Sequence, residues 1–212
     1  MQLTKLGHAC VRLEKDGGVL VIDPGAFSGD AALDGADAVL VTHEHFDHVV
    51  PDSLRAALAA RPGLRVWAPA PVAEQFAEFG DRARAVAHGD EFTAAGFGVH
   101  AYGADHAVIH PDIPGCANVG FLVDGEVFHP GDSWTVPEDP APTLLLPGSG
   151  PWHSTRQMID YARAVAPRRG FIIHEALLSE TGLAVLDMFL GPAAGPHGAT
   201  YTRLEPGTSV DL

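Results

Sequence analysis

The segment THEHFDHVVP at residues 42–51 carries three histidines and one aspartate within six positions, directly after the apolar run ADAVLV. Side chains two residues apart in an extended segment point to the same side, so His43 and His45 can converge on one metal ion. Asp47 and His48 then turn toward a second ion beside the first. Neutral imidazole and carboxylate are ligand types that suit zinc, manganese or iron. A histidine-rich surface loop is the alternative, but it does not account for this spacing.

Apolar runs and turn residues predict many short strands with a few helices. Helices are expected where the apolar period is helical, and Ser154 is a plausible cap for one of them. No linker divides the chain, so we expect one domain over residues 1–212, an α/β fold in which two mixed sheets pack face to face with helices outside. The predicted strands are 2–7, 10–15, 19–23, 38–42, 64–68, 84–88, 91–95, 97–105, 118–124, 126–130, 143–147, 169–174 and 199–207, and the predicted helices are 51–60, 71–80, 154–167 and 179–191.

Three further polar residues stand at the ends of predicted strands. His106 follows the strand FGVHAYGAD, His174 ends the strand RGFIIH, and Asp132 lies in HPGDS, where Gly131 allows a tight backbone turn. Active sites of layered α/β folds are usually built at such strand ends. These residues are therefore candidate partners of the histidine-rich segment.

The series THEHFDH, His106, HPGDS and FIIHE resembles the metallo-β-lactamase fold hydrolases, and the resemblance runs the whole length of the chain. The opening LGHACVRLEKDGGVLVIDP and the ending TRLEPGTSVDL are similar to the branch that contains L-ascorbate-6-phosphate lactonase and N-acyl-phosphatidylethanolamine phospholipase D-like proteins. The motif H-x-H-x-D-H with G-D is a strong marker of the superfamily. The two terminal segments mark the branch less specifically.

The resemblance implies an αββα sandwich with a two-metal site, with Zn²⁺ as first choice and Mn²⁺ or Fe²⁺ as alternatives. Asp23 would orient a ligand histidine, although an Asp-Pro turn explains it equally well, and His8 matches a position near the site without an assigned role. The implied ligands are His43, His45 and His106 for the first ion, Asp47, His48 and His174 for the second, and Asp132 as the bridge.

The expected mechanism follows from charge. Two divalent ions would lower the pKa of a shared water enough to form hydroxide at neutral pH, and Asp47 would take up the proton. His153 is a candidate general acid, with a surface position as the alternative. The loop at residues 104–118 holds both His106 and His110, and either could be the ligand. The stretch between Asp132 and the strand TLLLP is short, so the usual helix there is expected to be missing and the pocket to be open.

Charge and composition bound the partners. The 212 residues include 13 basic and 27 acidic ones, a formal net charge of −14, and no dense basic patch. Such a field repels nucleic acid, so we expect a small-molecule substrate and no nucleic-acid partner. No run approaches about 18 apolar residues, so no membrane span is expected. Cys10 and Cys116 are expected to be free thiols, and the N-terminus lacks the apolar stretch of a signal peptide, which favours a cytoplasmic protein.

Several functions compete with hydrolysis of a small ester, lactone or phosphoester. A metal-dependent nuclease or phosphodiesterase acting on nucleic acid shares the fold, but the net charge disfavours it. Flavin-coupled diiron reductases use H-x-E-x-D, which His45 does not match. Thioester hydrolases of the glyoxalase type usually continue the motif with Gly-Gly, where this chain has VVP. A non-catalytic, metal-organised binding module is expected to lack a ligand, and all seven candidates are present.

Overall fold

The computed structural model describes residues 1–29, 31–190 and 198–212 and contains two seven-stranded mixed sheets. The first sheet has the order β14-β1-β2-β3-β4-β5-β6 and the second β13-β12-β11-β10-β9-β8-β7. The strands are β1 (Gln2–Gly7), β2 (Cys10–Lys15), β3 (Gly18–Ile22), β4 (Ala38–Leu40), β5 (Arg65–Ala68), β6 (Ala83–Ala85), β7 (Glu91–Ala94), β8 (Phe97–Tyr102), β9 (Gly120–Val123), β10 (Val127–His129), β11 (Thr143–Pro147), β12 (Arg169–Ile173), β13 (Thr200–Thr202) and β14 (Ser209–Asp211).

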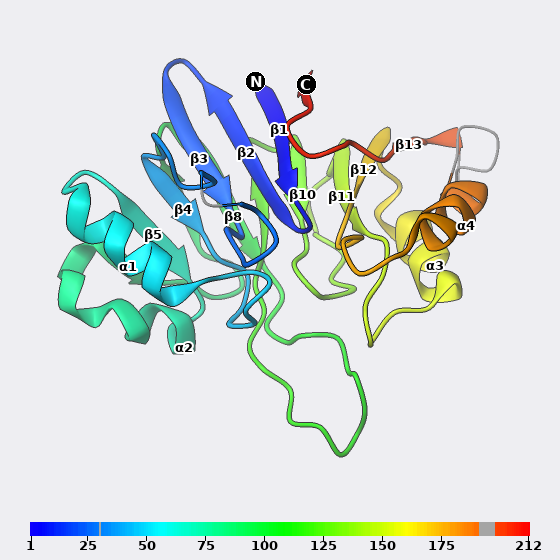
Figure 1. Cartoon of the computed structure of the whole chain (residues 1–212), viewed down its shortest axis with the longest axis horizontal. Coiled ribbons are helices and arrows are strands. Elements are labelled where there is room, and N and C mark those ends of the chain that lie inside the picture. The colour runs from blue at the N-terminus through cyan, green and yellow to red at the C-terminus, as the bar shows by residue number, and fades with distance from the viewer. Residues whose placement is uncertain (30, 191–197) are drawn as a thin grey trace.

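The two sheets face each other and the helices lie outside them (Figure 1). The helices are α1 (Pro51–Ala60), α2 (Ala70–Ala73), the 3-10 helix η1 (Glu74–Arg82), α3 (Thr155–Val165) and α4 (Glu180–Leu190). One hydrophobic cluster fills the space between the sheets, including Leu13 and Phe121. Separate clusters join the first sheet to α1 and α2, and the second sheet to α3 and α4. The predicted αββα sandwich is confirmed.

The topology brings the carboxyl ends of parallel strands from both sheets to one region. Strands β3, β4, β5 and β6 pair in parallel in the first sheet, as do β10, β11, β12 and β13 in the second. The amide of Val119 donates to Thr42 O at 2.9 Å, and that of His174 to His8 O at 3.2 Å, so the two sheets are joined there. Residues that follow these strands can therefore meet although they are far apart in the chain.

Most predicted elements are present, and the helices at 51–60 and 154–167 are confirmed. Ser154 caps α3 by accepting a hydrogen bond from Gln157 N. The predicted helix at 71–80 is wrong as a continuous α-helix, because Phe76 and Gly80 leave helical geometry and only a short α-turn precedes η1. The structure also contains β14, which was not predicted and which pairs with β1. Residues 133–142 form no helix, as expected.

Cys10 is buried, Cys116 is half-buried, and both are free thiols, as predicted. No helix within residues 1–29, 31–190 and 198–212 has the length and apolar character needed to cross a membrane.

Candidate metal centre

The histidine-rich segment forms a tight loop after β4 that packs against the loop after β3. His48 N donates to His45 O at 3.0 Å, and Ala26 N donates to Phe46 O at 2.9 Å. The two loops approach so closely that a Cβ on Gly25 would lie 1.9 Å from Asp47 O. Glycine is therefore required at this position, because any side chain would push the metal-binding motif away from its neighbour.

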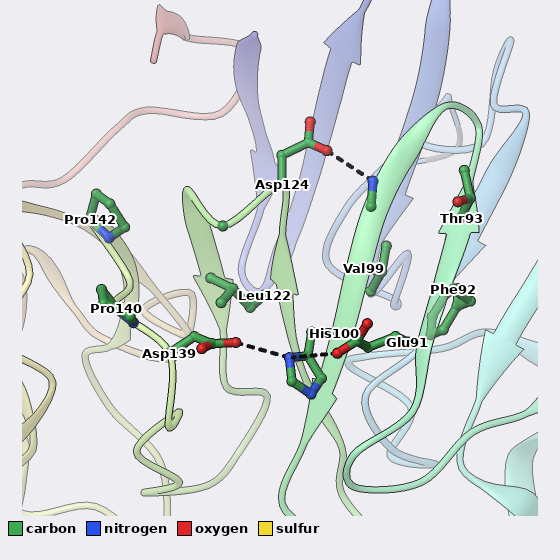
Figure 2. Close-up of a pocket in the computed structure, with 12 residues that line it drawn as sticks. Glu91, Phe92, Thr93, Val99, His100, Leu122, Asp124, Asp139, Pro140 and Pro142 are labelled. Atoms are coloured by element: carbon green, nitrogen blue, oxygen red, sulfur yellow. Dashed lines mark hydrogen bonds and ion pairs between the residues drawn. The ribbon is translucent and has the colours of Figure 1, made fainter.

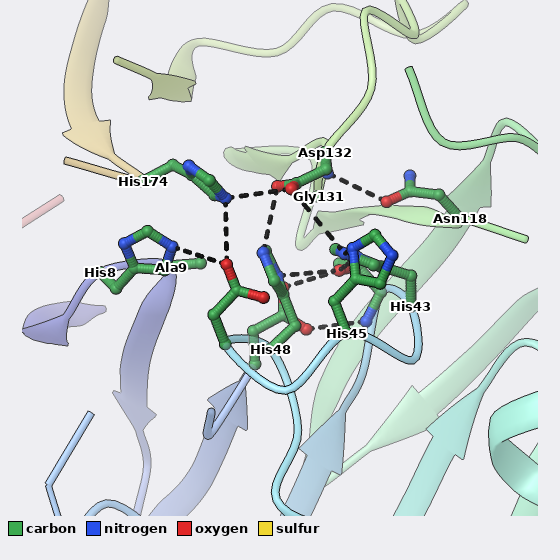
Figure 3. A network of polar contacts seen from close by, with 12 residues as sticks. His8, Ala9, His43, His45, His48, Asn118, Gly131, Asp132 and His174 are labelled. Atoms are coloured by element: carbon green, nitrogen blue, oxygen red, sulfur yellow. Dashed lines mark hydrogen bonds and ion pairs between the residues drawn. The ribbon is translucent and has the colours of Figure 1, made fainter. Parts of the chain in front are cut away.

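Histidine and aspartate side chains gather in two adjacent groups at this edge of the sheets (Figure 3). Within each group, one ligand atom of every residue lies within 4.8 Å of the others. The members come from loops that are up to about 170 positions apart in the chain, so the sheet topology assembles them. The first group is His43, His45, His106 and Asp132, and the second is His8, Asp47, His48 and His174.

Asp132 lies between the two groups. Its Oδ2 is 3.4 Å from His106 Nε2 in the first group and 3.0 Å from His174 Nε2 in the second, while its Oδ1 is 3.1 Å from His48 Nε2. Gly131, with φ +63°, makes the turn that was expected before Asp132. Asn118 Oδ1 accepts a hydrogen bond from Asp132 N at 3.0 Å and holds this turn in place. A carboxylate in this position can contact two ions at once.

His48 and His106 point Nε2 at the centre and bond outward through Nδ1. His48 Nδ1 is 2.7 Å from Asp23 Oδ2, and His106 Nδ1 is 2.6 Å from Ala107 O. An Nδ1 that donates to an oxygen leaves Nε2 with a lone pair, which is the tautomer a metal ligand needs. Asp23 thus contacts His48 as expected, and its carboxylate also accepts hydrogen bonds from the amide and the hydroxyl of Thr42.

The inner atoms have the environment expected of metal ligands. Among the residues that the structure describes, His48 Nε2, His106 Nε2, His174 Nε2 and Asp132 Oδ1 are buried and have no hydrogen-bond partner. His48 Nε2 and Asp132 Oδ1 do not bond although they are 3.1 Å apart. Buried polar atoms without partners are strongly unfavourable, and a cation between them would remove that cost. The donor set of imidazoles and carboxylates fits divalent transition metals.

The electrostatics of the groups lead to the same conclusion. Burial raises the pKa of Asp132, but the charge of His48 and the close approach of His106 and His174 outweigh it and hold the pKa well below the usual range. Burial lowers the pKa of His174, and the carboxylates of Asp132 and Asp47 more than compensate, raising it to about 9. Carboxylates that stabilise an added proton so strongly would stabilise a metal cation in its place.

Three site residues adopt a backbone conformation that only glycine adopts without strain. His8, Asp23 and His174 have φ values of +48°, +52° and +60°. Such a conformation costs about 1–3 kcal/mol for a residue with a Cβ, and it persists where the surrounding structure enforces it. Each of these residues follows a strand and turns its side chain back toward the two groups, so the strain lies where the site is assembled.

Comparisons with known proteins identify the family of the chain. A protein family described as "Beta-lactamase superfamily domain" matches residues 2–173. The chain belongs to the beta-lactamase superfamily. Protein Rv0786c of Mycobacterium tuberculosis is 39% identical to it over 218 residues, covering 100% of this chain and 95% of that protein. A UPF0173 metal-dependent hydrolase of Aeropyrum pernix is 34% identical over 82 residues, 36% of this chain and 33% of the relative.

Among solved structures, Igni18, a metallo hydrolase of Ignicoccus hospitalis, superposes on this superfamily member with a TM-score of 0.74 at 22% identity, covering 99% of this chain and 97% of that one. This likeness confirms the metallo-β-lactamase fold. With the metal-dependent hydrolases among its relatives and the two His/Asp groups, the superfamily member is an enzyme of the metal-dependent hydrolase class.

The structure distinguishes the loop histidines that the sequence left open. His106 lies in the first group, whereas the side chain of His110 is exposed and pairs with Asp112. His153 lies outside both groups, in a groove beside α3 and α4. Burial, with the charge of His174, lowers the pKa of His153 to about 4. Its role as general acid stays a prediction.

His8 is the site residue whose role was not assigned from the sequence. Its Nδ1 accepts from Ala176 N at 3.3 Å, so the ring proton lies on Nε2. That Nε2 is 3.2 Å from Asp47 Oδ2 and donates to it. His8 therefore orients the carboxylate of Asp47 in this superfamily member. The signals in the sequence were a histidine between two strands, after Gly7, and its match to a position near the site in the branch that the chain resembles.

Two further contacts support the site without a signal in the sequence. Trp152 Nε1 donates to Asp132 Oδ2 at 3.1 Å. Lys5, fully buried on β1, has its Nζ 2.6 Å from Glu175 Oε1 and 2.9 Å from Ile172 O. Because Glu175 directly follows His174, this ion pair anchors the end of β12 to the other sheet.

A cavity of about 280 Å³ opens directly onto the two groups, and Asp47, His106, Asp132 and His174 form part of its wall. A larger and more open hollow, of about 800 Å³, lies over β7, β8 and β9 near Glu91, His100 and Asp139 (Figure 2). None of the residues in the two groups lines that hollow. The smaller cavity is therefore the one where a substrate can meet the metal centre.

Proposed function

We propose that the protein hydrolyses a small ester, lactone or phosphoester with two divalent metal ions held at the edge where the two sheets meet. The observation that carries this proposal is the pair of adjacent His/Asp groups joined through Asp132. Their buried inner atoms lack hydrogen bonds within the described part of the chain, as expected where cations bind.

The proposed ligand set follows the two groups. When bound, two divalent ions supply a water of lowered pKa and polarise the oxygen of the bond to be cleaved. Zn²⁺ is the proposed metal, and Mn²⁺ and Fe²⁺ suit the same donors. His43, His45 and His106 would hold one ion, Asp47, His48 and His174 the other, and Asp132 both.

The side chains of the protein then have distinct tasks. Asp47 lines the cavity, and its Oδ2 is held by His8, which leaves Oδ1 to accept a proton from the attacking water. Trp152 fixes Asp132 through its indole N–H, and Asp23 fixes the ring of His48. These contacts hold the reacting groups in place, so little reorganisation accompanies the reaction.

Residues 1–212 would act as a single domain, because one hydrophobic cluster spans both sheets. The terminal segments favour the branch that contains L-ascorbate-6-phosphate lactonase and N-acyl-phosphatidylethanolamine phospholipase D-like proteins, and the free thiols fit a cytoplasmic location.

Protein expressed in metal-supplemented medium is expected to carry about two divalent ions per chain, one for each group of ligands. Elemental analysis measures this content, and p-nitrophenyl esters, lactones and phosphodiesters report turnover with zinc and with manganese. Removal by a chelator should abolish hydrolysis, and addition of metal should restore it. Metal-free protein after such expression, or hydrolysis that a chelator leaves unchanged, would contradict the proposal. RNA cleavage faster than ester cleavage would favour a nuclease.

Asp23→Asn is expected to weaken metal binding by about 10- to 100-fold, because a substituted amide would place a donor where His48 Nδ1–H now finds an acceptor. A competition titration with a chromophoric chelator measures the affinity. Asp37→Asn is the matched control: Asp37 accepts from Val19 N on the same sheet and lies in neither metal group. Equal affinities in the two variants would show that Asp23 does not support the ligand.

A further inference from the structure

The cavity at the metal centre is bounded on its open side by apolar side chains. The rings of Phe27 and Phe46 pack edge to face with their centroids 5.7 Å apart. Phe46 is 65% exposed and Leu177 60%, and both line the same cavity. The apolar residues that line the cavity are Phe27, Phe46, Ile109, Pro151, Trp152 and Leu177. Apolar surface that stays exposed around a concave site marks the place where a ligand binds.

The apolar rim continues onto the long loop between β8 and β9, which projects beyond the body of the molecule (Figure 1). Val108 and Ile113 on this loop are also exposed. The base of the loop is fixed by His106 N donating to Cys116 O at 3.0 Å and by the bridge between Asp105 and Ala117. The rim is therefore attached to the same backbone that positions a ligand of the first group.

The charge of the cavity wall restricts what can bind. Within the described part of the chain, no lysine or arginine lines the cavity, and its charged carboxylates are those of Asp47 and Asp132. Proteins bind phosphate and carboxylate groups with arginine or lysine, and the metal ions can neutralise only the group that reacts. An additional anionic group on a substrate would meet apolar side chains and a chain of net charge −14.

We infer that the substrate is an uncharged molecule that carries an apolar acyl or alkyl group next to the bond to be cleaved, seated between Phe46 and Leu177. This inference rests on the proposed function and narrows it: a neutral ester, lactone or comparable acyl compound is favoured over a phosphomonoester. The cavity of about 280 Å³ lies at the small end of ligand pockets, so the group that enters is short.

A pair of esters that differ only in one terminal charge tests the inference. The metal-loaded protein is given p-nitrophenyl hexanoate and the mono-p-nitrophenyl ester of adipic acid, whose acyl chain is equally long but ends in a carboxylate. In both, the water oxygen bonds to the acyl carbon, nitrophenolate leaves with the bonding electron pair, and both protons of the water pass to solvent. The expected kcat/KM is at least about tenfold higher for the hexanoate, because the terminal carboxylate of the adipate ester would lose hydration against apolar side chains without gaining a counter-charge.

A single substitution at the rim should change this preference. Leu177→Lys places a cation beside the cavity and is expected to shift the ratio of the two kcat/KM values about fivefold toward the adipate ester. Met188→Lys is the matched control, because Met188 is 70% exposed and does not line the cavity. The control should keep the preference of the natural chain.

Binding measurements separate failure of the inference from failure of the proposed function. Isothermal titration compares hexanamide with adipamic acid, which carry the same chains without a reactive ester. The inference is supported if hexanamide binds more tightly than adipamic acid and if Leu177→Lys, but not Met188→Lys, reduces this preference. If neither ester is hydrolysed while this binding preference holds, only the proposed function fails. The inference is overturned if adipamic acid binds as tightly as hexanamide or more tightly. It is also overturned if the adipate ester or p-nitrophenyl phosphate is hydrolysed faster than the hexanoate ester, and in that case the proposed hydrolase activity still stands.

Discussion

Replacing Asp132 by alanine is expected to abolish turnover and to remove at least one metal ion per chain. Its carboxylate lies within 3.0 to 3.4 Å of His48, His106 and His174 and joins the two groups of ligands. Alanine leaves three buried imidazoles without the carboxylate that they share, so two cations held in the neighbouring groups would lose the negative charge between them. We expect kcat/KM to fall by more than about 100-fold, beyond the effect of an outer contact.

Metal content by elemental analysis and kcat/KM on the same preparation measure this effect. Asp139→Ala is the control, since Asp139 also bonds a histidine, His100, but lies in neither group. Circular dichroism should show that both variants fold. The loss of the acceptor for Trp152 adds a destabilisation of about 1–3 kcal/mol in Asp132→Ala, which would lower its melting temperature but would not by itself remove metal. Unchanged metal content and turnover in Asp132→Ala would refute the bridging role.

Lys5→Met is expected to lower the free energy of unfolding by about 3–5 kcal/mol. Lys5 and Glu175 have only 1% and 11% of their side chains exposed, so removing the ammonium leaves a carboxylate buried without its counter-charge. Restoring neutrality should reverse most of this loss, because a buried ion pair and an apolar pair of similar volume are often nearly equal in stability. The double variant Lys5→Met/Glu175→Leu is therefore expected to have a free energy of unfolding close to that of the natural chain.

Urea unfolding of the metal-loaded protein, at one fixed metal concentration, measures these differences. Lys15→Met is the matched control: Lys15 pairs with Asp124, but both are partly exposed, and such a pair contributes about 0–1 kcal/mol. A loss of stability in Lys5→Met no larger than in Lys15→Met would show that the buried pair does not anchor β12. A double variant as unstable as the single one would show that packing of the Lys5 chain, and not its charge, is what matters.

Local sequence patterns predicted what depends on neighbouring residues. The helix at 51–60 begins and ends at the expected residues, and Ser154 caps α3, because helical period and capping act over one or two turns. The order of strands and helices predicted the layered sandwich. The prediction of a continuous helix at 71–80 was wrong, because the backbone leaves helical geometry at Phe76 and Gly80. The apolar period of the sequence did not indicate this break.

The sequence by itself determined which residues are available as ligands, through the spacing H-x-H-x-D-H and the polar residues after later strands. Only the tertiary structure decided that His106 and not His110 joins the first group, that His8 holds Asp47, and that His153 stands apart. It also decided the pairing of β14 with β1 and the apolar wall of the cavity. The physical reason is distance along the chain: these contacts depend on sheet register and on how loops pack, and side chains far apart in the sequence leave no periodic pattern that records their meeting.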